Sequence, residues 1–149
     1  MLGKIAVVLG FVPVALVAQE TKVRMKDLPA AVQKTVQEQT RTAKLRGLSK
    51  EIEKGKTFYE AETTVNGKSR DVLMDADGTV VEVEEATTLA AIPESARQAF
   101  QKQAGAAGKI LSVETVTKGS AVDYEAVIQK GGKKSEVAVH TDGSRVKDE

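Results

Sequence analysis

The chain contains no cysteine and no tryptophan, and aromatic residues make up only 3% of its 149 residues. Without cysteine, the protein has no disulfide, no thiolate metal site, no thiol nucleophile and no lipid-modified N-terminal cysteine. The core must therefore consist mainly of Val, Ile, Leu and Ala. Phe58, Tyr59, Phe100 and Tyr124 are the few large side chains available to it.

The chain also lacks an excess of charge of either sign, with 22 basic and 21 acidic residues and a net charge of +1. This balance argues against a nucleic-acid-binding protein, which needs a clustered basic surface. The only histidine, His140, has Asp142 and Ser144 nearby in sequence, but a turn does not arrange such residues as a catalytic triad. The sequence therefore predicts no catalytic residue, no cofactor and no metal ligand, and a protein that is not an enzyme.

No long hydrophobic run is present. The longest, Ile5 to Val17, has 13 residues and follows Lys4. This run is too short to span a bilayer comfortably but has the length of a signal-peptide core. We predict a signal peptide over residues 1–18 with cleavage after Ala18; the alternative is an uncleaved N-terminal anchor. Cleavage predicts a periplasmic or secreted protein that has no membrane association afterwards.

Several short motifs occur twice, at an offset of 64 to 65 residues. They are Leu28-Pro29 with Ile92-Pro93, Tyr59-Glu60-Ala61 with Tyr124-Glu125-Ala126, and Asp77-Gly78 with Asp142-Gly143. A fixed offset indicates a structural repeat. We therefore predict an α+β fold of two tandem repeats, 26–85 and 90–149, each one helix followed by a four-stranded antiparallel meander, with the helices on one face of the sheet. The fourth strand of the second repeat is expected around Val146.

The order and spacing of these motifs resemble the PepSY-like family. The matching residues are Leu28-Pro29, Tyr59-Glu60-Ala61, Asn66-Gly67-Lys68 and Asp75-Ala76-Asp77-Gly78-Thr79-Val80. The resemblance covers about residues 26–149, and two such units are similar in plan to the beta-lactamase inhibitor protein. It implies export and a non-enzymatic role, such as inhibition of a protease or another envelope enzyme.

The segment Asp75-Ala76-Asp77-Gly78 starts like a calcium-binding loop, but the positions that would complete such a loop are Val83 and Ala86. Neither supplies a carboxylate. A β-turn is favoured, in which Asp accepts a local hydrogen bond and Gly takes a positive φ. A small-ligand or metal-binding periplasmic sensor, using Asp75, Asp77 and His140, is the alternative function.

Alternation along the strands places one set of acidic and apolar side chains on a single sheet face. As candidate partner-binding residues we list Phe58, Glu60, Glu62, Asp71, Leu73, Asp123, Glu125, Val127 and Glu136. A plain solvated face is the favoured explanation of the carboxylates alone, whereas Phe58 favours a binding surface slightly. We predict that this face binds a protein partner in the cell envelope. The predicted edge strands leave the oligomeric state open.

Overall fold

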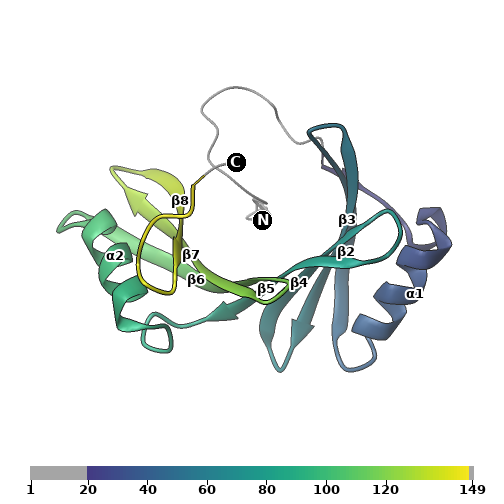
Figure 1. Ribbon diagram of the computed structural model, residues 1–149, viewed down its shortest axis with the longest axis horizontal. Coiled ribbons are helices and arrows are strands. Elements are labelled where there is room, and N and C mark those ends of the chain that lie inside the picture. The colour runs from purple at the N-terminus through teal and green to yellow at the C-terminus, as the bar shows by residue number, and fades with distance from the viewer. Residues whose placement is uncertain (1–19, 148–149) are drawn as a thin grey trace.

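The computed structural model describes residues 20–147, and its eight strands form one antiparallel sheet (Figure 1). The predicted signal peptide, residues 1–18, lies outside the described residues and stays a prediction. The strands follow one another across the sheet in sequence order, which confirms the predicted antiparallel pairing. They are β1 Thr21–Lys22, β2 Lys44–Glu53, β3 Lys56–Val65, β4 Lys68–Asp75, β5 Val80–Thr87, β6 Gly108–Lys118, β7 Ala121–Lys130 and β8 Lys133–His140.

Two α-helices and a short 3-10 helix, η1 (Met25–Asp27), complete the described fold. Helix α1 spans Ala30–Gln39 and helix α2 spans Glu94–Ala104. Each starts directly after a proline, Pro29 or Pro93, whose φ of −55° or −53° suits a helix start. Helix α2 ends at Gly105, where φ is +61°, a conformation that glycine adopts readily.

The prediction of two tandem repeats, each a helix followed by four strands, is wrong. The chain forms one continuous eight-stranded sheet with two helices, in which β5 pairs directly with β6. Strand β1 precedes the first helix, and in the described chain three strands follow α2. The segment around Val146 makes only an isolated Val139–Arg145 bridge and a hydrogen bond from Val146 N to Ala138 O (3.1 Å). A single apolar residue there buries too little surface to hold a full strand.

Two apolar clusters lie between the helices and the sheet. The N-terminal core contains Leu28, Val32, Val36, Leu48, Ala61, Val72 and Met74. The C-terminal core contains Ile92, Ala96, Phe100, Ala104, Val113, Ala126, Ile128, Val137 and Val139. The strand register places both clusters on the same face, because Val72 opposes Val83, Val83 opposes Thr117, and Val113 lies four residues before Thr117 on β6.

The sheet is curved, and both helices lie on the outside of the curve (Figure 1). Register shifts in three strand pairs, between Leu45 and Gly47, Leu73 and Met74, and Ile110 and Ser112, accompany this shape. Such bulges increase the local twist of a sheet. Neither helix covers the inner side of the curve, which we call the concave face. Within residues 20–147, the sheet thus has one face covered by the helices and one face that the helices leave uncovered.

Candidate binding face

Three rows of side chains cross the strands on the concave face. The register pairs each residue with the next in its row. The first row is Ser49, Glu60, Leu73 and Glu82; the second is Glu62, Asp71, Glu84, Val116, Asp123 and His140; the third is Ala86, Glu114, Glu125 and Ala138. Carboxyl groups make up at least half of each row. The basic and acidic residues of the whole chain nearly balance, but their distribution gives one face that is rich in carboxyl groups.

All nine residues predicted to bind a partner lie on the concave face. Phe58 opposes Asp75 and lies two positions before Glu60, and Val127 opposes Glu136 beyond the third row. The other predicted residues are Glu60, Glu62, Asp71, Leu73, Asp123 and Glu125, within the rows. The structure brings the nine residues to one face, while their role in binding stays a prediction.

Three of the predicted carboxylates already have a basic neighbour within the chain. The guanidinium of Arg46, on β2, donates to Asp71 Oδ1 (2.8 Å) and to Glu62 Oε2 (3.5 Å). Asp123 Oδ1 lies 2.7 Å from His140 Nδ1, so the only histidine of the chain has a carboxylate partner. Arg46 therefore partly neutralises Glu62 and Asp71 before any partner arrives, whereas His140 carries a charge only when it is protonated.

Glu60 and Glu51 are buried next to each other. Each is 3% exposed, and the Ser49 hydroxyl donates to Glu60 Oε2 (3.3 Å). Burial, followed by repulsion from Glu51, raises the pKa of Glu60 to about 8. Burial and the charge of Glu20 raise the pKa of Glu51 to about 6. A buried carboxyl without a cation favours its neutral form, so Glu60 binds a proton at neutral pH.

Strands β7 and β8 carry a second pair of carboxyl groups with raised pKa values, Glu125 and Glu136. Burial, followed by repulsion from Glu136 and Glu114, raises the pKa of Glu125 to about 8. Burial and Glu114 raise the pKa of Glu136 to about 7. The Tyr-Glu-Ala motif found twice in the sequence therefore places one proton-binding carboxyl near each end of the concave face.

Between these two sites, Glu82 and Glu84 lie on β5. Lys118 Nζ contacts Glu82 Oε2 at 3.0 Å, although Glu82 is only 5% exposed. Burial, and then a hydrogen bond with Glu82, raises the pKa of Glu84 far above its usual range. Lys118 therefore pairs with Glu82, while Glu84 retains its proton.

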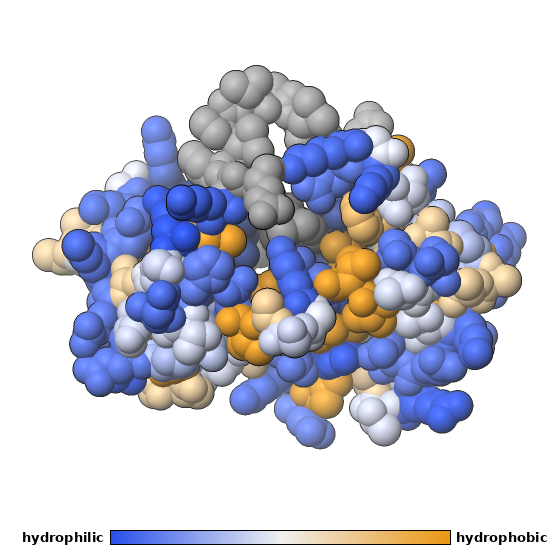
Figure 2. Space-filling view, viewed as in Figure 1, coloured by the Kyte–Doolittle hydropathy of each residue, from blue (hydrophilic) through white to orange (hydrophobic). Residues whose placement is uncertain are grey.

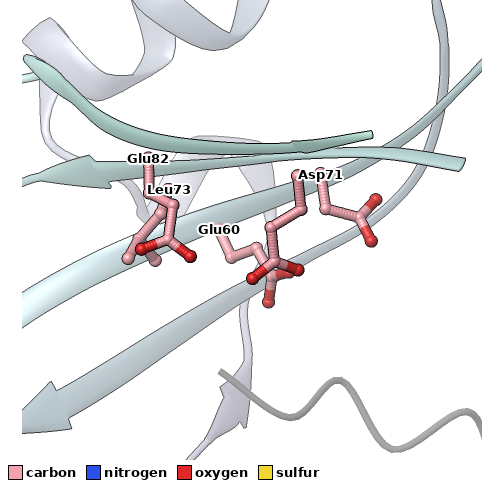
Figure 3. A pocket seen from close by; sticks show the side chains of 5 residues that line it. Glu60, Asp71, Leu73 and Glu82 are labelled. Carbon is pink, nitrogen blue, oxygen red and sulfur yellow. The ribbon is translucent and has the colours of Figure 1, made fainter. Parts of the chain in front are cut away.

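A small cavity of about 10 Å³ lies among these groups, lined by Glu60, Asp71, Leu73, Glu82 and Glu84. Figure 3 shows the labelled carboxyl groups projecting to the same side of the strands. The cavity has room for about one water molecule. The centre of the concave face is thus packed with carboxyl groups and offers no pocket for a small molecule.

A larger hollow of about 480 Å³ lies at the end of β3 and β4, lined by Lys56, Thr57, Phe58, Asp75, Ala76, Asp77 and Val81. The surface seen in Figure 2 is mostly hydrophilic, with hydrophobic residues gathered near the centre of the view. Phe58 is half-buried and lines this hollow, at the rim of the concave face. A side chain of a partner can reach it there.

The Asp-Gly segments have the hydrogen bonds of turns. Asp75 Oδ1 accepts from the backbone of Asp77 and Thr79 (both 3.1 Å), and Asp77 Oδ1 accepts from Thr79 N (2.9 Å). Asp142 Oδ1 accepts equivalently from Ser144 N (2.8 Å). Within residues 20–147, no group of three or more acidic, histidine or cysteine side chains is arranged to hold a metal ion.

Sequence reasoning missed four acidic residues of this face, namely Glu51, Glu82, Glu84 and Glu114. The spacing of Glu82 and Glu84, two residues apart on a strand, was a usable signal, because such residues share a face. Which face they share depends on the bulge between Leu73 and Met74, where Val81 is unpaired. The bulge could not be located from the sequence.

Solved structures with a similar fold come from Bacteroides species. A protein of Bacteroides eggerthii, whose name gives the periplasm as its proposed location, is 20% identical with a TM-score of 0.65; the match covers 80% of this chain and 86% of that one. A DUF2874 family protein of Bacteroides uniformis is 19% identical, with a TM-score of 0.63 and coverage of 80% and 86%. A BLIP-like protein of Bacteroides fragilis is 17% identical, with a TM-score of 0.57 and coverage of 81% and 85%.

These likenesses concern the fold alone, because the identities are low. The BLIP-like neighbour supports the predicted similarity of fold to the beta-lactamase inhibitor protein. No protein-family model and no curated protein matches the sequence. None of the helices within residues 20–147 is both long enough and apolar enough to cross a bilayer.

Proposed function

We propose that this is an exported, non-enzymatic binding protein that uses its concave face to bind a protein partner in the periplasm or outside the cell. The observation that carries the proposal is a curved sheet with both helices on the outside and an uncovered, carboxyl-rich inner side. A protein partner suits the centre of this face better than a small molecule, since the cavity there measures only about 10 Å³ and the hollow of about 480 Å³ lies at the rim. Inhibition of an envelope enzyme or protease is one form that such binding takes.

One prediction and one finding further support this proposal. The predicted signal peptide provides the route of export, and the names of similar structures include a periplasmic and a BLIP-like protein. The PepSY-like resemblance, which also implies a non-enzymatic exported protein, stays a prediction. The metal-sensor alternative has no comparable support, because Asp75 Oδ1 and Asp77 Oδ1 already accept hydrogen bonds within their turn.

The test is to identify a partner by affinity capture from envelope extract and then to map the surface that it contacts. We expect Phe58→Ala and Val127→Ala, both on the concave face, to weaken binding at least tenfold. Glu38→Gln, at an exposed position on α1 outside the curve, is the matched control and should leave the affinity unchanged. Equal affinity of all three variants and the unaltered protein, with their folds intact, would exclude the concave face.

A further inference from the structure

The carboxyl groups of the concave face outnumber the cations that reach them. Arg46 pairs with Asp71 and Glu62, and Lys118 pairs with Glu82. Within residues 20–147, Glu60, Glu84, Glu125 and Glu136 have no ion pair with a basic side chain of this chain. A cationic group placed over the face would therefore complete the pairing that Arg46 begins.

We propose that the partner binds through an extended segment rich in arginine or lysine, and that this segment displaces protons from the carboxyl groups beneath it. The inference rests on the proposed function, and it names the chemistry of the partner and a linkage of binding to pH. Each displaced proton leaves a carboxylate that the incoming cation neutralises, so charge is balanced at the face. The measurable consequence is that binding releases protons into the solution.

At the N-terminal end of the face, Glu60 is the central group. Glu51 on β2, Glu62 on β3 and Asp71 on β4 surround it, with Glu20 farther away, and all of them disfavour its ionisation. Arg46 is engaged by Asp71 and Glu62. A cation above Glu60 would reverse this balance, because an opposite charge within about 4–6 Å favours the ionised form.

At the C-terminal end, Glu125 holds the equivalent position. Glu114 on β6, Glu136 on β8 and Glu82 on β5 disfavour its ionisation, and Lys118 acts in the opposite direction with a smaller effect. Asp123 on the same strand is paired with His140. Like the N-terminal end, this end favours a cation from outside over a further anion.

The spacing of these groups indicates the form of the segment. Glu60, Glu84 and Glu125 lie on β3, β5 and β7, so each step crosses two strands and is about 10–12 Å long. An extended chain advances about 3.3 Å per residue. Because the side chains of an extended chain alternate between its two sides, a segment running across the strands would place a basic side chain over each carboxyl at every fourth position, about 13 Å apart.

The test uses a synthetic peptide of twelve residues with arginine at every fourth position, together with a matched peptide that has glutamate in place of arginine. Titration calorimetry between pH 6 and pH 9, in buffers of different ionisation enthalpy, measures both the affinity and the protons released. We expect only the arginine peptide to bind, with an affinity that rises at least tenfold from pH 6 to pH 9. Proton release near pH 7 should accompany binding.

Glu60→Gln and Glu125→Gln should each remove part of the proton release and lower the affinity at pH 9 severalfold, with little effect at pH 6. Glu136→Gln is a further variant if either of these fails to fold, and Glu38→Gln is the matched control outside the curve. No binding of the arginine peptide, or binding without proton release, overturns this inference. If Phe58→Ala nevertheless lowers the affinity for the natural partner, the proposed function survives. If substitutions on the concave face leave that affinity unchanged, the proposed function fails as well.

Discussion

The N-terminal half of the molecule (residues 20–87) and the C-terminal half (88–147) share their local devices but differ in how they end. In both, a proline starts the helix and an Asp-Gly turn packs against the first turn of that helix. In the first half, the strand after this turn, β5, joins β4 to β6. In the second half, the residues after the turn form only a bridge, and β8 remains an edge strand of the described sheet. Similar turns do not guarantee similar topology.

The sharpest contrast between the halves is the size of one buried side chain on each helix, valine on α1 and phenylalanine on α2. Val36 and Phe100, 64 residues apart, are both fully buried. We expect Phe100→Ala to lower the free energy of unfolding by about 4 kcal/mol, because it removes a large buried side chain and leaves a cavity. Val36→Ala should cost about 2 kcal/mol, because it removes fewer buried carbon atoms. Urea denaturation measures both values, and equal losses would contradict the contrast.

The turns that touch the helices give the next largest effect. Gly78 and Gly143 have φ of +86° and +82°, and a Cβ atom there would lie 2.7 Å from Ala31 O or 2.6 Å from Ser95 O. We expect Gly78→Ala and Gly143→Ala each to lower the free energy of unfolding by about 3 kcal/mol, through backbone strain and overpacking together.

Gly67 and Gly132 are the matched controls for these substitutions. Their φ angles are +79° and +78°, and a Cβ atom added at either position would have no other atom within 4 Å beyond its chain neighbours. Alanine at either control position therefore tests backbone strain alone, at about 1–2 kcal/mol. If thermal unfolding shows equal losses at the control and helix-contact glycines, the close approach to the helix contributes nothing to stability.

Glu60 and Glu125 should make similar contributions to the pH dependence of stability in the two halves. Folding raises the pKa of each from 4.5 to about 8, so the native state binds more protons than the unfolded state between these values. Stability is therefore greatest below about pH 4.5 with respect to these groups and falls as pH rises toward 8, by at most about 1.4 kcal/mol per pH unit for each.

Glu60→Gln and Glu125→Gln should each flatten this pH dependence by a similar amount, because glutamine does not ionise. Denaturation at pH 5, 7 and 9 measures the slope, with Glu38→Gln as the control on α1. A steeper effect of one substitution would show that the two ends of the concave face differ in how strongly they resist ionisation.

The sequence predicted much of the local structure. Prolines at the helix starts, alternation along the strands and Asn-Gly or Asp-Gly turns each act over a few residues, and all nine candidate residues lie on one face. The tandem topology was wrong, because the fate of the segment around Val146 depends on its burial in the assembled sheet. The raised pKa values on this face could not be predicted from the sequence either. They depend on burial and on bulges, and Glu51 and Glu60 become neighbours only after β2 and β3 pair.

The smallest difference between the halves concerns their ion pairs on the concave face. Arg46 and Asp71 are 24% and 18% exposed, and Arg46 also donates to the Ser69 hydroxyl and the Thr63 carbonyl. His140 and Asp123 are 48% and 18% exposed, and the histidine is charged only when protonated.

Double-mutant cycles with Arg46→Met/Asp71→Asn and His140→Asn/Asp123→Asn should give coupling energies of about 1 kcal/mol and about 0.3 kcal/mol at pH 8. A histidine coupling that is the larger at pH 8 would mean that Asp123, rather than Asp71, is the more firmly held carboxylate, and would make the N-terminal end of the concave face the easier one for a basic partner to enter.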